Sequence, residues 1–204
     1  MLPEKQLAAA VRKLAGVPMQ GPFSRAVNLF HVFPKPDARV SAKPKPLWGM
    51  GSKLRGARYT PKNSFETVYV SCDPVTALAE VTAIIAEAGG PPVALVTSPW
   101  VMITIEGTLT SVLDLTAQSV VRALGTSYQE LTGAWRYVPG QTGEPPTHLL
   151  GRICHESKRF DGIRFPSSKN PPHGICVAIF PDRLKGSAYI EVYDPHDNIA
   201  QRLP

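Results

Sequence analysis

The stretch TVYVSCDPVTALAEVTAIIAEAGG, Thr67 to Gly90, contains both kinds of secondary structure on which the fold depends. Its opening run is mostly β-branched and aromatic, which is typical of a short strand. A cap at Ser71 or Asp73, followed by Pro74 in the first turn, then predicts a helix over residues 74–88, stopped by two glycines. The chain is therefore expected to pass directly from a strand into a helix.

Glu80 is the most unusual residue of this predicted helix. The helix carries only two charges, Glu80 and Glu87, and Glu80 shares its face with small or apolar residues such as Ala77 and Ile84. A carboxylate in that position either points to solvent or projects into a cavity where its charge has a task, because an unpaired buried carboxylate is costly. The helix alone favours the solvent-facing position.

Other segments of the chain carry strand or helix patterns. Strands are expected within residues 22–33, 67–72, 92–115, 160–168, 174–181 and 187–194, and helices over 2–16 and 118–135, with 148–160 ambiguous but compatible with a helix. Strands dominate and helices are inserted between them, so the fold class is α+β. We expect a helical N-terminal extension over residues 1–20 and a main domain over residues 21–204.

Positive charge is concentrated in the first third of the chain. Residues 1–62 contain twelve Lys and Arg against only Glu4 and Asp37, whereas the remainder has a net charge of −4. This asymmetry indicates a nucleic acid, an acidic partner or a phosphate-bearing ligand. Lysines alternate with prolines in residues 35–46, which favours an extended loop and argues against sequence-specific binding of nucleic acid by this segment.

The segment GSKLRGARYTPKN, Gly51 to Asn63, is the basic part that is most suited to a ligand. It places Lys53, Arg55 and Arg58 between glycines and an aromatic, with no acidic residue among them. Guanidinium groups recognise phosphates by paired hydrogen bonds, so we predict a turn that holds an anion.

The composition also limits the class of protein. The start of the chain has no apolar run like that of a signal sequence, and the most apolar later stretch is interrupted by Thr, Ser and Pro, so we expect a soluble, cytoplasmic protein without a membrane segment. Cys72, Cys154 and Cys176 lack CxxC spacing, and the five histidines lack the spacing of ligands. We therefore expect reduced, mostly packed thiols and no metal.

Three motifs in this order resemble the RES domain family, the toxin half of RES–Xre toxin–antitoxin pairs. They are GARYTP at 56–61, TVYVSCDPVTALAE at 67–80, and FDGIRFPSS at 160–168 leading into GICVAIFPD. The resemblance covers residues 23–184 and places the family's arginine, tyrosine, glutamate and serine on Arg58, Tyr69, Glu80 and Ser167. The sequence departs from the family pattern at Ala57, Tyr59 and Lys169, where the family has glycine, tryptophan and arginine.

The resemblance implies a fold similar to ADP-ribosyltransferases, with two small, bent, mostly antiparallel sheets surrounded by helices. It also implies that NAD is a consumed substrate and not a retained cofactor, that the bond between nicotinamide and ribose is broken, and that water or phosphate accepts the ADP-ribose. A protein ADP-ribosyltransferase of the same fold is one alternative, and a non-catalytic basic protein that binds nucleotide or nucleic acid is another. An Xre-like antitoxin is the implied partner, and a homo-oligomer stays open.

The residues named above suit this chemistry. Breaking an N-glycosidic bond develops positive charge on the ribose, which the Glu80 carboxylate would stabilise. Arg58, with Arg55 as a weaker helper, would bind the pyrophosphate. Tyr69 would stack on nicotinamide. Ser167 would form a hydrogen bond with the nicotinamide amide or with the ribose attached to nicotinamide. The remaining predicted NAD contacts are Tyr59 and Ser168.

Overall fold

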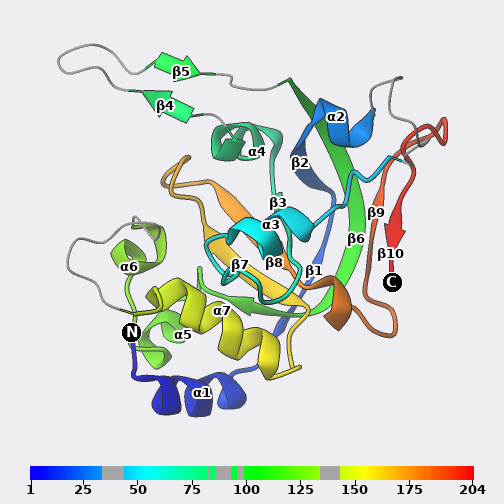
Figure 1. Cartoon of the computed structure of the whole chain (residues 1–204). Coiled ribbons are helices and arrows are strands. Elements are labelled where there is room, and N and C mark those ends of the chain that lie inside the picture. The colour runs from blue at the N-terminus through cyan, green and yellow to red at the C-terminus, as the bar shows by residue number, and fades with distance from the viewer. Residues whose placement is uncertain (34–43, 82, 86–92, 96–98, 134–142) are drawn as a thin grey trace.

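The computed structural model describes residues 1–33, 44–81, 83–85, 93–95, 99–133 and 143–204, without the side chains of 31, 83–85 and 93–95 (Figure 1). The helices are α1 Glu4–Lys13, α2 Leu29–Val32, α3 Met50–Arg55, α4 Pro74–Val81, α5 Gln118–Ala123, α6 Tyr128–Thr132, α7 Pro146–Glu156 and the 3-10 turn η1 Pro181–Arg183. The strands are β1 Val17–Gln20, β2 Phe23–Asn28, β3 Val68–Ser71, β4 Ala83–Ile85, β5 Val93–Leu95, β6 Trp100–Asp114, β7 Gly162–Pro166, β8 Ile175–Ile179, β9 Tyr189–Val192 and β10 Arg202–Leu203.

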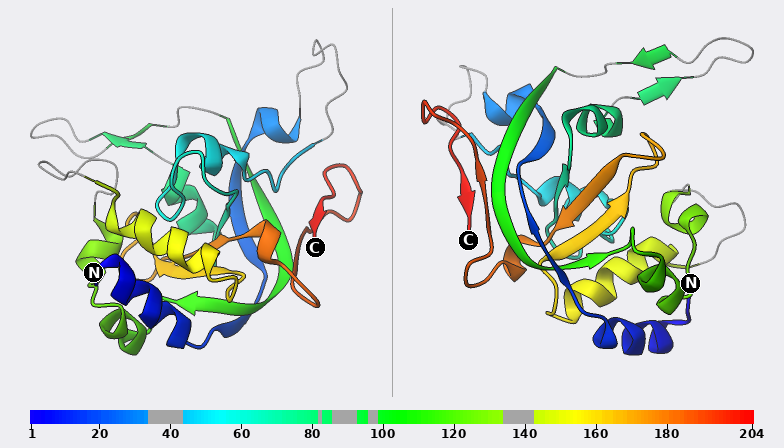
Figure 2. Two further views of the ribbon diagram at one scale, coloured as in Figure 1. Left: turned by 60° about the horizontal axis from the view of Figure 1, so that its bottom comes forward. Right: turned by 180° about the vertical axis from the view of Figure 1, so that it is seen from behind.

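One mixed sheet of eight described strands organises the molecule. Its order is β10-β9-β6-β2-β3-β8-β7, and β1 pairs with β6. The end of β6 also pairs in parallel with β7, from Val112 opposite Gly162 to Asp114 opposite Arg164. Because β6 contacts both β2 and β7, the strands β6, β2, β3, β8 and β7 close into a ring. Figure 2 shows β6 as the long curved strand that makes this closure possible.

The α+β class is confirmed, but the arrangement of the strands differs from the expectation of two small sheets. The structure has one large mixed sheet, and its second sheet is only the pair β4–β5. The long strand β6 accounts for the difference. It runs for fifteen residues and pairs with β2 over its first part and with β7 at its end, so one continuous strand joins what was expected to be two sheets.

The two faces of β3 and β8 contribute to two separate apolar clusters. Val68 and Val177 belong to one cluster, whereas Tyr69 and Cys176 contact the other. The cluster that includes Cys176 is covered by α1 and α7, and Leu7 of α1 is fully buried in it. Burying such a side chain stabilises a fold by roughly 1.5–3 kcal/mol. The predicted N-terminal helix therefore shares a core with the rest of the chain.

Two predicted elements are wrong in part. The helix expected over residues 74–88 ends at Val81, and the β-branched residues that follow enter β4 instead, where β-branching favours extended backbone; residues 86–92 lie outside the described part. The strand expected over residues 22–33 ends at Asn28, because the Asn28 side chain accepts a hydrogen bond of 2.9 Å from the Phe30 backbone and begins α2.

Glycines divide two other predicted segments. The first half of the basic segment at Gly51–Asn63 is helical as α3, which ends where Gly56 adopts a φ of +77°. The helix expected over residues 118–135 is interrupted by Gly125 with a φ of +59°, giving α5 and α6, and 134–135 are not described. The ambiguous segment at 148–160 is mostly helical, within α7.

A few remaining features bear on the expectations above. The three cysteines are free, with Cys154 and Cys176 buried and Cys72 exposed. Within the described ranges, no group of three or more His, Cys, Asp or Glu could hold a metal, and no helix has both the length and the apolar character to cross a membrane. Most of the Lys/Pro segment, residues 34–43, lies outside the described part.

Candidate active site

Glu80 and Ser167 meet directly although they are 87 residues apart in the chain. Ser167 follows β7 and is fully buried, while Glu80 lies near the end of α4 and is exposed. The Ser167 hydroxyl donates to Glu80 Oε1 at 2.6 Å, a short, charge-assisted hydrogen bond. The sequence motifs that contained these two residues thus converge on one site.

The Ser167 hydroxyl is fully occupied by protein groups. Its oxygen accepts hydrogen bonds from the backbone N–H of Lys169 at 3.0 Å and of Asn170 at 3.1 Å. A serine hydroxyl has one proton and two lone pairs, so these bonds and the bond to Glu80 use all of its capacity. In this conformation Ser167 therefore orients Glu80, and the direct contact between Ser167 and NAD stays a prediction. The two contacts described for this carboxylate, with Ser167 and with Cys176, both involve Oε1, and the residue as a whole is exposed.

A buried thiol also faces the same carboxylate oxygen. Cys176 Sγ lies 3.7 Å from Glu80 Oε1 and 3.5 Å from the hydroxyl of Ser71, its partner across β3 and β8. Burial, with the Glu80 charge second, raises the pKa of Cys176 to about 12. The thiol is therefore neutral at physiological pH and carries a proton that it can share with the carboxylate.

The loop after β7 is also bonded to the start of α4. Asp73 accepts hydrogen bonds from the Thr76 backbone at 2.8 Å and from the Thr76 hydroxyl at 2.6 Å, and so caps the helix. The pKa of Asp73 is lowered chiefly by the hydrogen bond from the Thr76 hydroxyl. The hydrogen bond from the Thr76 backbone lowers it further. The Asn170 side chain donates to the same hydroxyl at 2.8 Å.

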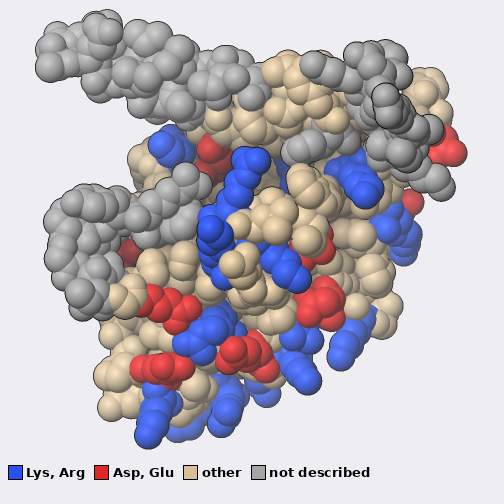
Figure 3. Space-filling model, viewed as in Figure 1, with Lys and Arg blue, Asp and Glu red and all other residues tan. Residues whose placement is uncertain are grey.

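Three hydrogen bonds fix the guanidinium group of Arg58, and one of them goes to Ser168, the neighbour of Ser167. Its Nη1 donates to the carbonyl oxygens of Leu131 at 2.8 Å and Gly133 at 2.9 Å, where α6 ends. Its Nη2 donates to the Ser168 hydroxyl at 3.1 Å. Ser167 and Ser168 therefore connect Glu80 and Arg58 through adjacent side chains. Figure 3 shows Lys and Arg side chains over α3.

Tyr69 supports the turn that carries Arg58. Its hydroxyl accepts the backbone N–H of Tyr59 at 3.0 Å and lies 3.0 Å from the Thr60 hydroxyl. Burial raises the pKa of Tyr69 to about 12, so the phenol stays neutral. Its ring is only half-buried, and an NAD contact by that ring remains a prediction.

The other two predicted NAD contacts have different surroundings. Tyr59 is fully buried, packed on Phe165 with ring centroids 4.7 Å apart, and burial raises the pKa of its hydroxyl. In this conformation Tyr59 is a core residue that a ligand does not reach. Arg55 is exposed at the end of α3.

Sequence reasoning placed Thr76 on the helix face of Glu80, one turn before it, but gave it no role. It missed Asn170, which bonds to Thr76, and Cys176, which faces the Glu80 carboxylate. Asn170 and Cys176 had no detectable signal, because only the fold brings β7, β8 and α4 together.

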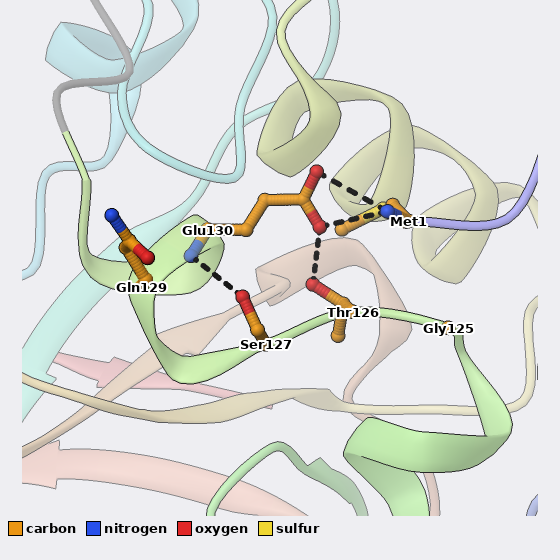
Figure 4. A pocket seen from close by; sticks show the side chains of 6 residues that line it. All are labelled: Met1, Gly125, Thr126, Ser127, Gln129 and Glu130. Atoms are coloured by element: carbon orange, nitrogen blue, oxygen red, sulfur yellow. Dashed lines mark hydrogen bonds and ion pairs between the residues drawn. The ribbon is translucent and has the colours of Figure 1, made fainter.

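One surface hollow is lined by other residues, although Glu130 in its lining precedes Leu131, whose carbonyl binds Arg58. It has a volume of about 410 Å³ and is lined by Met1, Gly125, Thr126, Ser127, Gln129 and Glu130. Figure 4 shows Glu130 pointing into it, bonded to the Met1 ammonium at 2.9 Å and to the Thr126 hydroxyl at 2.6 Å. It contains none of the predicted site residues.

Comparisons with known proteins agree with the motifs. Residues 29–200 match the RES domain, so the chain belongs to the RES domain family. Its fold is similar to that of a chain in the crystal structure of the M. tuberculosis MbcT–MbcA toxin–antitoxin complex, with a TM-score of 0.61 and 15% sequence identity. That alignment covers 98% of this chain and 92% of the other. No curated protein sequence gives a significant match.

Proposed function

We propose that the protein is a toxin that cleaves NAD between nicotinamide and ribose. The observation that carries the proposal is the exposed Glu80 carboxylate, oriented by the saturated Ser167 hydroxyl. Membership of the RES domain family supports the assignment, because the motifs that define the resemblance supply both residues.

The reaction needs little more than one positioned carboxylate. The C1′–N1 bond breaks, its electron pair neutralises the cationic nicotinamide ring, and positive charge develops on the ribose. The negative charge of Glu80 Oε2 would stabilise that charge and accept a hydrogen bond from a ribose hydroxyl. Water or phosphate then attacks C1′ and, in the case of water, a proton is released to solvent or to Glu80. The ADP-ribose acceptor distinguishes hydrolysis from phosphorolysis.

Arg58 would supply the anion-binding part of the site. Three oxygen acceptors fix its guanidinium group, which leaves its remaining N–H groups for a pyrophosphate oxygen. Fixing the group before binding reduces the conformational entropy that binding would otherwise cost. Lysine lacks the planar fork, so Arg58→Lys is expected to bind NAD more weakly.

An Xre-like antitoxin is the proposed partner. The support is the family together with the likeness in fold to a chain of the MbcT–MbcA toxin–antitoxin complex. The positive charge of residues 1–62 suits an acidic segment of such a partner, and a complex of that kind would weaken as salt is raised.

Incubation of the purified protein with NAD tests the proposed activity. We expect NAD to be lost and nicotinamide to be released in equal amounts, with phosphate dependence if phosphate is the acceptor. Transfer of label from NAD to a macromolecule would instead indicate a protein ADP-ribosyltransferase. Intact NAD, together with oligonucleotide binding that falls steeply with salt, would favour a non-catalytic binding protein.

A further inference from the structure

We propose that Thr76 and Asn170 are positioning residues for Glu80. This inference rests on the proposed function, because it concerns the residue that would stabilise the transition state. Neither side chain touches the carboxylate, so both would act by holding α4 and the loop over residues 167–170 at a fixed separation.

Thr76 and Glu80 lie on one face of α4, four residues apart. Both reach the same loop: Thr76 is bonded to Asn170 at 2.8 Å and Glu80 to Ser167 at 2.6 Å. The loop is therefore fastened to the helix at two points about one turn apart. Backbone bonds between Ser167, Asn170 and Gly174 hold the loop together, and the two side-chain bonds restrain its orientation against α4 more than the Ser167 bond alone would.

Two chains of hydrogen bonds begin at Asn170 and end on carboxylates of the α4 region. In one, the Asn170 side chain donates to Thr76, whose hydroxyl donates to Asp73 at 2.6 Å. In the other, the Asn170 backbone donates to Ser167, whose hydroxyl donates to Glu80. Each hydroxyl accepts and donates at once, which polarises it and strengthens both of its bonds.

The burial of Thr76 determines what happens when its hydrogen bond to Asn170 is lost. Thr76 is fully buried, so water does not replace Asn170 when the bond is lost. A displacement of about 1 Å at a reacting group can cost roughly 10²-fold in rate. Because Ser167 belongs to the same loop, movement of the loop would disturb the Ser167–Glu80 bond.

A matched pair of variants at Thr76 tests the idea. Thr76→Val keeps the shape and removes the hydroxyl, while Thr76→Ser keeps the hydroxyl. We expect kcat for NAD cleavage to fall by about 10-fold to 10²-fold in the valine variant with KM little changed. The serine variant should stay near wild type. Asn170→Ala removes the donor from the loop side and should reproduce the effect of valine, so a folding defect in one variant does not decide the result.

Thr76→Val in a Glu80→Gln background shows whether Thr76 acts through Glu80. If it does, Thr76→Val causes no further loss there, because residues that act as a unit are not additive. A further loss of the same size in that background would overturn the proposal.

Hydrogen exchange tests the geometry without NAD. The Asn170 amide should exchange about 10-fold faster in Thr76→Val than in wild type, while amides of β8 stay unchanged. Unchanged exchange at Asn170 would overturn the positioning role even if NAD is cleaved. Faster exchange in a protein that leaves NAD intact would support the link and refute the proposed activity separately.

Discussion

Gly151 of α7 lies against the backbone of Tyr59 so closely that a Cβ atom at Gly151 would be 1.9 Å from the Tyr59 carbonyl oxygen. Real Cβ atoms do not approach backbone oxygens to that distance, and neither the helix nor the buried Tyr59 can easily move. Because Tyr59 follows Arg58, this contact between helix and turn also sets the position of Arg58.

Gly151→Ala is therefore expected to lower the free energy of unfolding by several kcal/mol, roughly the upper range for overpacking a core, and to weaken NAD binding. Thermal or denaturant unfolding measures the first effect. Gly51→Ala is the matched control, since Gly51 is also helical and a Cβ there meets nothing within 4 Å. It should be neutral or stabilising by up to about 1 kcal/mol. Equal stability of the two variants would contradict the close packing.

Ser167 and Ser168 are expected to affect different kinetic constants. Ser167→Ala removes the donor to Glu80 and leaves two backbone N–H groups without their acceptor, so kcat should fall and stability should drop by about 1–3 kcal/mol. Ser168→Ala removes one of three acceptors of Arg58 and should mainly raise KM. Steady-state kinetics with NAD measures both, and the opposite assignment of kcat and KM effects would contradict the geometry.

His155 is expected to make the fold sensitive to acid. Its Nε2 lies 3.0 Å from both carboxylate oxygens of Asp182, its Nδ1 lies 3.4 Å from Arg183 Nη2, and its ring stacks on Phe65 at 3.9 Å. Burial lowers the pKa of His155, an effect that Asp182 opposes and Arg183 adds to. The unfolded chain then binds the proton more readily than the folded one, so stability is lost as the pH falls through the ordinary value of 6.5.

Denaturant midpoints between about pH 8 and about pH 5 measure this dependence. His155→Gln should reduce the slope of stability against pH in that window. The slope should not vanish, because burial also lowers the pKa of His148. A variant with the same slope as wild type would show that His155 does not contribute.

The cysteines should differ sharply in reactivity. Cys154 and Cys176 are buried, and burial raises the pKa of both thiols, so little thiolate is present and reagents do not reach them. Cys72 is exposed. Alkylation followed by mass spectrometry should label only Cys72 in the native protein and all three residues after unfolding. Native labelling that persists in Cys72→Ser would contradict the burial of the other two.

Local patterns in the sequence predicted the strand–helix unit that carries the candidate site. The β-branched run before Pro74 is β3, and the capped segment after it is α4. The same reasoning extended the helix beyond Val81, because Thr and Ile residues tolerate either structure and only pairing with β5 favours the strand.

The closure of the sheet could not be read from local patterns. It depends on the pairing of Asp114 in β6 with Arg164 in β7, which are fifty residues apart and joined by helices. The helix alone favoured a solvent-facing Glu80, and the residue is indeed exposed. Its hydrogen bond to Ser167 was not predicted, because Ser167 was placed in the site only through the resemblance to the RES domain family. Whether the predicted site residues contact NAD stays a prediction.

The most direct test of the account is the rate of nicotinamide release from NAD by wild type, Glu80→Gln and Glu106→Gln. Glutamine keeps the size of Glu80 and its capacity to accept from Ser167 but removes the negative charge. Glu106 is an exposed glutamate on β6 and serves as the control. We predict a loss of about 10² to 10³ in rate for Glu80→Gln and an unchanged rate for Glu106→Gln. Equal rates in all three folded proteins, or no release by any of them, would contradict the assignment of Glu80.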